Sequence, residues 1–143
     1  MNCPFCDPKV IEKQSLYETE NIRIIYNICP ANKGQCLVVP KRHVLNIREL
    51  TKDELVDLIF SIQLVSLRYD QYFKPAGFNY GFNEGRYAGQ MVDHFHFHIM
   101  PRVDGDKNRL PEHHLFHRDP KTRRNLTFEE IEPFVTELKK LFR

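Results

Sequence analysis

The stretch His94-Phe95-His96-Phe97-His98-Ile99-Met100, followed by Pro101-Arg102, decides the fold. Histidines and apolar residues alternate along it, which is the period of a β-strand whose successive side chains point to opposite faces. On such a strand the apolar residues face a core and the three histidines line the other face. Next-but-one side chains lie about 7 Å apart, at roughly 3.3 Å per residue. That spacing is too wide for three rings to bind one ion without distortion, but it lets them surround a small anion.

The whole chain has the size and composition of one globular domain. It has 143 residues, 41% of them hydrophobic and 28% charged, which is enough for an ordinary core. A net charge of +2 gives no reason to expect nucleic-acid binding. No apolar run approaches the roughly 20 residues of a membrane span, and no secretory signal is recognisable. We therefore expect a cytoplasmic protein with reduced cysteines and no membrane partner.

The N-terminus carries the motif Cys3-Pro4-Phe5-Cys6. In a reducing compartment this spacing is typical of half a zinc site or of a redox pair, and two incidental thiols are the third interpretation. A redox motif is expected where a strand leads into a helix, and no strand is expected before this one. A zinc site would need two further ligands from elsewhere, and His43, in the turn after Pro40, gains interest only as such a partner.

The remaining patterns predict an α+β domain with an antiparallel sheet of about five strands, a long helix and a C-terminal helix. Capping boxes at Thr51–Glu54 and Thr127–Glu130 predict helix starts. Pro133 conflicts with the second helix, which therefore begins either at 127 or near Glu132 with the proline in its first turn. The expected elements are a hairpin at 16–18 and 22–26, strands at 35–40, 78–83 and 94–100, a helix at 51–72, an irregular loop at 103–126 and a helix at 127–143, all in a single domain 1–143.

The histidine strand suits chemistry at phosphorus. A neutral imidazole is a fair nucleophile, and its neighbour can hold a phosphate oxygen and donate a proton. The loop at 84–90 contains two glycines, so its backbone amides could approach an oxyanion beside the imidazoles. Three more histidines lie at 112–118, where a surface loop is a commoner explanation than a second metal site.

From Cys3 to about Arg102 the sequence resembles the histidine triad (HIT) nucleotide hydrolases and transferases. The resemblance rests on the complete His-φ-His-φ-His-φ-φ motif, on Ala88-Gly89-Gln90 before it and on Pro101-Arg102 after it. It also includes the N-terminal Cys-x-x-Cys, the segment from Gly34 to His43 and the residues from Gly77 onward. It implies a homodimer, in which the sheet continues across the interface.

The resemblance also implies roles for individual residues. His96 would attack the α-phosphate and form a nucleotidyl-histidine intermediate, and His98 would bind that phosphate and assist proton transfer. As in many bacterial relatives, a closed structural zinc site would be formed by Cys3, Cys6, His43 and His94. The nucleotide-binding residues would be Phe5, Ile25 and Ile28 around the base, Asn27 at the ribose, and Gln35, Asn83 and Gln90 near the phosphates.

One position departs from the family pattern. Many relatives carry a histidine where this chain has Gln35, which can hydrogen-bond a phosphate oxygen but carries no charge. The expected function is hydrolysis or nucleotidyl transfer on an AMP-containing dinucleoside polyphosphate or nucleoside phosphoramidate. The alternative is a zinc-stabilised nucleotide-binding or interaction protein with little turnover. The least favoured alternative is a catalytic metal bound by the triad.

Overall fold

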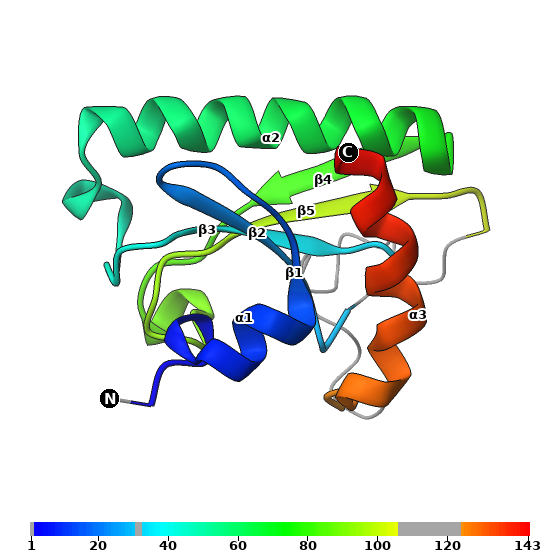
Figure 1. Ribbon diagram of the computed structural model, residues 1–143. Coiled ribbons are helices and arrows are strands. Elements are labelled where there is room, and N and C mark those ends of the chain that lie inside the picture. Colours follow the sequence, from blue (N-terminus) through cyan, green and yellow to red (C-terminus); the bar gives the residue numbers. More distant parts are fainter. Residues whose placement is uncertain (1, 31–32, 106–123) are drawn as a thin grey trace.

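The computed structural model describes residues 2–30, 33–105 and 124–143. Five strands form one antiparallel sheet in the order β1-β2-β3-β5-β4 (Figure 1). The strands are β1 Ser15–Glu18, β2 Ile22–Tyr26, β3 Cys36–Pro40, β4 Gly77–Gly81 and β5 Phe97–Arg102. The α-helices are α1 Pro8–Gln14, α2 Lys52–Phe73 and α3 Phe128–Lys139, with 3-10 turns at Pro4–Cys6, Ile47–Glu49, Arg86–Ala88 and Lys140–Phe142. The predicted α+β class and sheet are confirmed.

The two faces of the sheet are covered differently. Helix α2 lies across one face, and its buried residues Leu58, Val65 and Tyr69 pack on Ile24 of β2 and Val38 of β3. The N-terminal segment covers the other face, where a second cluster contains Cys3, Phe5, Ile25, Leu37 and Val39. In Figure 1 the N-terminal helix α1 lies on the side of the sheet opposite α2. The alternation of β2 and β3 thus divides their apolar side chains between two cores.

The histidine segment joins the sheet later than its alternation predicts. β5 begins at Phe97, so His94, Phe95 and His96 precede the paired strand. There the chain is held by the neighbouring turn instead, since Phe95 N–H donates to Val44 O at 2.7 Å. Within β5, His98 pairs with Leu37 of β3 and lies on the face of the second cluster.

Both predicted capping boxes are present, with the Thr51 and Thr127 hydroxyls accepting from the backbone three residues on. Helix α3 begins at Phe128 and carries Pro133 in its interior, so the alternative start near Glu132 is wrong. The capping box and the buried Ile131 stabilise the first turn more than the proline disrupts it. Helix α1 is absent from the sequence-based expectations. Among the described residues, no helix is both long and apolar enough to cross a membrane.

Candidate active site and metal centre

Four residues from three distant parts of the chain bring metal-binding atoms together. Sγ of Cys3 and Sγ of Cys6 lie 3.4 and 3.6 Å from Nδ1 of His94. Nδ1 of His43 lies 3.5 Å from Sγ of Cys6 and 3.2 Å from Nδ1 of His94, and all four atoms lie within 4.8 Å of one another. Bonds of about 2.3 Å to sulfur and 2.05 Å to nitrogen place tetrahedral zinc ligands roughly 3.3–3.8 Å apart. The residues therefore fit a closed Cys₂His₂ site.

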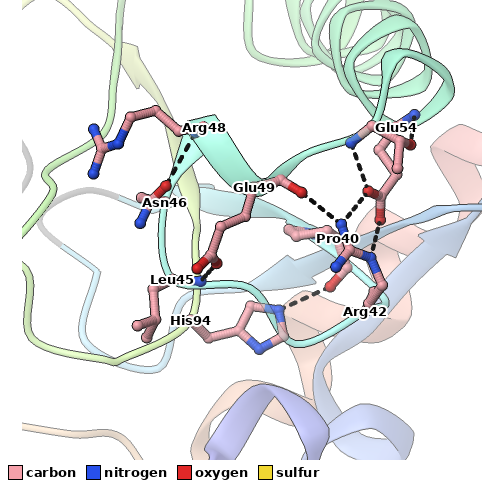
Figure 2. Close-up of polar contacts among 9 residues, drawn as sticks. Pro40, Arg42, Leu45, Asn46, Arg48, Glu49, Glu54 and His94 are labelled. Atoms are coloured by element: carbon pink, nitrogen blue, oxygen red, sulfur yellow. Dashed lines mark hydrogen bonds and ion pairs between the residues drawn. The ribbon is translucent and has the colours of Figure 1, made fainter.

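Hydrogen bonds already orient the histidine ligand. Nε2 of His94 lies 2.8 Å from the carbonyl oxygen of Pro40, and because a carbonyl only accepts, this nitrogen carries the ring proton. Nδ1 is then left with its lone pair toward the thiols. Burial lowers the pKa of His94, so the ring favours the neutral form that ligates metals. Figure 2 shows the imidazole of His94 directed at Pro40.

The turn that carries His43 is clamped to the start of α2. Nη2 of Arg42 lies 2.8 Å from Oε1 of Glu54 and donates to the carbonyl of Glu49 at 2.7 Å (Figure 2). Glu54 is 5% exposed and also accepts from the Thr51 N–H, completing the capping box. The hydrogen bond from Arg42 lowers the pKa of Glu54. The start of α2 and the turn that carries His43 thus share one carboxylate.

The second histidine, His96, uses Nδ1 for a hydrogen bond to the backbone. Nδ1 of His96 lies 2.7 Å from the carbonyl oxygen of His94, so Nδ1 carries the proton and Nε2 keeps its lone pair. Burial lowers the pKa of His96, although the bond to His94 opposes the shift. The rings of His96 and His98 are 5.0 Å apart, and Phe5 packs edge-on against His96 at 5.3 Å. A neutral imidazole with a lone pair on one ring nitrogen is what nucleophilic attack needs.

These histidines open onto a cavity of about 570 Å³, within the usual range for small-ligand sites. Of the predicted site residues, five line it: Phe5, Asn27, Ile28, His96 and His98. They come from the N-terminal turn, the loop after β2, the segment that leads into β5, and β5 itself. The remaining lining residues are Pro4, Val10, Gln14, Cys29, Leu37, Met91, Val92, Arg124 and Asn125.

Four predicted nucleotide-binding residues are not among those lining this cavity. Ile25 is buried in the second cluster together with Phe5, and Gln35 is buried with its Nε2 3.1 Å from Nδ1 of His98. Asn83 lies beside Gly89. The side-chain amide of Gln90 hydrogen-bonds to the backbone. Its oxygen accepts from Gly85 N–H at 2.7 Å, and its nitrogen donates to the carbonyls of Leu45 and Val92.

The loop amides expected to face an oxyanion are used inside the loop. The N–H of Gly85 is taken by the Gln90 side chain, and those of Ala88, Gly89 and Gln90 donate to the carbonyls of Gly85 and Arg86. The two glycines serve this tight turn, with φ of +83° at Gly85 and +95° at Gly89. These four amides are therefore already used within the loop.

Sequence reasoning missed the contribution of the C-terminal segment. Arg124 and Asn125 line the cavity, and the next residue, Leu126, donates its N–H to the carbonyl of Ile28 at 2.7 Å. Both fall in the expected irregular loop, and no local pattern marks them. Residues 106–123, including the histidines at 112–118, lie outside the described part of the chain.

Comparison with known proteins agrees with this geometry. The model of the HIT domain family matches residues 8–105. A bis(5'-adenosyl)-triphosphatase of Dictyostelium discoideum is 32% identical over 99% of this chain and 95% of its own. An adenosine 5'-monophosphoramidase of Schizosaccharomyces pombe is 34% identical over 71% of this chain and 75% of its own. The crystal structure of a Zn-bound histidine triad family protein from Mycobacterium smegmatis covers 99% of this chain and 96% of its own, with 26% identity and a TM-score of 0.70. The chain belongs to the HIT domain family.

Proposed function

We propose that this chain is a nucleotidyl hydrolase or transferase that attacks the α-phosphate of an AMP-containing nucleotide through His96. The observation that carries the proposal is the hydrogen bond from His96 Nδ1 to the carbonyl of His94 at 2.7 Å, which leaves the ring lone pair on Nε2 in a residue that lines the cavity. Two relatives are named as hydrolases, one of a bis-adenosyl triphosphate and one of an adenosine phosphoramidate. Dinucleoside polyphosphates and nucleoside phosphoramidates are accordingly the substrate classes to test.

In the first step the lone pair of His96 Nε2 forms a bond to the α-phosphorus. The bond from phosphorus to the leaving oxygen or nitrogen breaks, and its electron pair departs with the leaving group. The imidazole of the resulting nucleotidyl-histidine is positively charged, and the carbonyl of His94 stabilises that charge at Nδ1. His98, whose ring lies 5.0 Å from that of His96, is within reach of the phosphate oxygens.

In the second step water, or another acceptor in a transfer reaction, attacks the same phosphorus. The nitrogen–phosphorus bond breaks, its electron pair returns to His96 Nε2, and the water proton leaves to solvent. The product is AMP. Phe5 and Ile28 supply apolar walls for the base, and Asn27 supplies a polar side chain at the same rim.

We also propose that Cys3, Cys6, His43 and His94 hold a structural zinc ion. When bound, the ion would tie the N-terminus, the turn at His43 and the approach to β5 together, with no open position for catalysis. Phe5, which packs against the rings of both His94 and His96, would be fixed with it. Two thiolate ligands require reduced cysteines, which supports a cytoplasmic location.

A homodimer is the assembly we propose. β4 is an end strand of the sheet, and Tyr80 on it is 43% exposed. The outward face of α2 carries three large apolar side chains, Ile59, Phe60 and Leu67, that are 63%, 64% and 57% exposed. An open strand edge beside an apolar helix face is a surface that a second copy would cover.

The nucleophile assignment is tested with diadenosine triphosphate and adenosine 5'-phosphoramidate as substrates and AMP release as the readout. We expect His96→Ala to abolish release. His96→Asn keeps an N–H donor for the His94 carbonyl but lacks the attacking nitrogen, so it should be equally inactive while still binding AMP. AMP release that persists in His96→Asn would overturn the assignment. AMP binding by the unaltered chain without turnover of either substrate would favour the nucleotide-binding alternative.

A further inference from the structure

Gln35 is a buried polar residue that contacts His98 without itself being among the residues that line the cavity. It is 0% exposed, and its Nε2 lies 3.1 Å from Nδ1 of His98. Its backbone carbonyl accepts from Asn27 N–H at 3.1 Å, so one residue supports both the phosphate side and the ribose side of the cavity. Gly34 precedes it with φ +94°, and a Cβ there would lie 2.5 Å from the ring of Phe73. The conformation of the backbone before Gln35 therefore requires a glycine at position 34.

The contact with His98 has a defined direction. An amide nitrogen donates but has no lone pair to accept, so Gln35 Nε2 donates to His98 Nδ1. Nδ1 then carries no proton, and the ring proton of His98 is on Nε2. An imidazolium would carry a proton on Nδ1 as well, so its Nδ1–H and the amide N–H would face each other as two donors with no acceptor between them. The neighbouring His96 has the opposite arrangement, with its proton on Nδ1.

We propose that Gln35 is a positioning residue that holds His98 as the neutral Nε2–H tautomer, so that the site favours phosphoanhydride over phosphoramidate bonds. The preference rests on the function proposed above, whereas the tautomer follows from the contact alone. In this form His98 Nε2–H donates a hydrogen bond to a non-bridging oxygen of the α-phosphate and keeps its proton. A neutral imidazole is a poor acid, since losing that proton would leave an imidazolate.

The leaving groups respond differently to such a site. When His96 Nε2 bonds to the phosphorus of a dinucleoside polyphosphate, the departing oxygen is part of a phosphate that is stable as an anion near pH 7. It takes the electron pair and needs no proton. The nitrogen of a phosphoramidate must gain a proton before it departs, and His98 does not supply one. Positioned acids contribute about 10²–10⁴-fold to such steps.

The tautomer is tested by ¹⁵N NMR of histidine-labelled, zinc-loaded full chain, because protonated and bare ring nitrogens have well-separated shifts. We expect His98 with a bare Nδ1 and a protonated Nε2. Gln35→Glu, when ionised, offers only acceptors and should hold a proton on Nδ1 in addition to the one on Nε2, which makes His98 an imidazolium that can act as an acid. Gln35→Met, similar in volume but without a donor, should remove the tautomer preference. Gln71→Glu, the same change at an exposed position of α2, should change nothing. A protonated Nδ1 on His98 in the unaltered chain would overturn the proposal.

The substrate preference is tested by the ratio of kcat/KM for diadenosine triphosphate to that for adenosine 5'-phosphoramidate. We expect the ratio to favour the triphosphate in the unaltered chain. In Gln35→Glu it should shift toward the phosphoramidate by at least about tenfold, the result of restoring an acid. An unchanged ratio would overturn the preference. Turnover of neither substrate would overturn the proposed function and the preference together, while the NMR measurement still decides the tautomer.

Discussion

Replacement of Cys3, one of the four proposed zinc ligands, should destabilise the fold strongly. Cys3 is 8% exposed and its sulfur lies 3.4 Å from His94 Nδ1. Cys3→Ser replaces a thiolate with a hydroxyl, a much poorer zinc ligand. We expect the variant to bind zinc weakly enough for a chelator to remove it under conditions where the unaltered chain keeps it.

The size of the effect follows from the loops that the ion closes. The proposed zinc ion would link Cys6 to His43 across 37 residues and His43 to His94 across 51 residues. Treated as cross-links that restrict the unfolded chain, loops of these lengths contribute about 4 kcal/mol each. Together they set an upper limit of about 8 kcal/mol, a large share of the roughly 5–15 kcal/mol that stabilises a typical domain. Loss of even one loop should lower Tm by about 12 °C, at roughly 3 °C per kcal/mol for a chain of this size.

The assay combines zinc content by mass spectrometry with thermal unfolding, each before and after chelation. Cys29→Ser is the matched control, because Cys29 lies in the cavity wall and outside the metal-binding group. It should keep about one zinc per chain and the unaltered Tm. Full zinc content in chelated Cys3→Ser, or a Tm that chelation leaves unchanged, would refute the reasoning. Zinc that is lost from His96→Ala would instead place the ion at the triad.

Three further changes test other parts of the structure. Glu54→Gln should lower the free energy of unfolding at pH 7 by about 2 kcal/mol. Because Arg42 lowers the pKa of Glu54, the carboxylate stabilises the fold above its ordinary pKa of about 4.3, and this stabilisation disappears as pH falls through the lowered pKa. The free energies of unfolding of the variant and the unaltered chain should therefore converge in acid. Arg124→Ala should raise KM for diadenosine triphosphate several-fold with kcat unchanged, since Arg124, whose guanidinium is paired with Glu130, lines the cavity but is not one of the proposed reacting groups. Phe60→Glu, which places a charge on the apolar face of α2, should convert the proposed dimer to a monomer in light scattering.

Matched controls separate these effects from general damage. Glu132→Gln removes an exposed carboxylate on α3 and should leave the pH dependence of unfolding unchanged. Lys140→Ala removes an exposed cation away from the cavity wall and should leave KM unchanged. Tyr87→Glu alters a fully exposed aromatic residue outside α2 and should leave the mass of the assembly unchanged. If Glu54→Gln, Arg124→Ala or Phe60→Glu behaves like its control, the corresponding contact does not have the role given to it.

The sequence predicts the sheet well because its signals are local. The apolar patterns at 22–26 and 94–100 and the capping boxes at Thr51 and Thr127 each lie within a few residues. The strands and helix starts that they predict are present, although β5 begins only at Phe97. Helix α1 has a local signal as well, since Asp7 caps it and Pro8 occupies its first position. This signal directly follows the Cys-x-x-Cys motif, which by itself indicates metal or redox chemistry and not a helix start.

Much of the site depends on contacts between distant segments, which no local pattern contains. The proton positions on His94 and His96 are set by the carbonyls they meet, and the contact between Gln35 and His98 spans 63 residues. Arg124 reaches the cavity because Leu126 pairs with Ile28. The interpretation of the loop at 84–90 is incomplete for the same reason. Its glycines indicate that backbone amides can approach a ligand, but they do not indicate which of these amides already hydrogen-bond within the loop.

The strand order has a consequence for how the protein is made. β5 lies between β3 and β4, although both precede it in the chain. During synthesis β4 emerges from the ribosome with no neighbour to pair with, and β3 keeps one edge open until β5 follows. An incomplete chain that ends before Phe97 thus presents unpaired strand edges, the form in which nascent chains are prone to associate with one another. β5 carries His98, so the pairing of this strand with β3 and β4 both completes the sheet and places His98 beside His96.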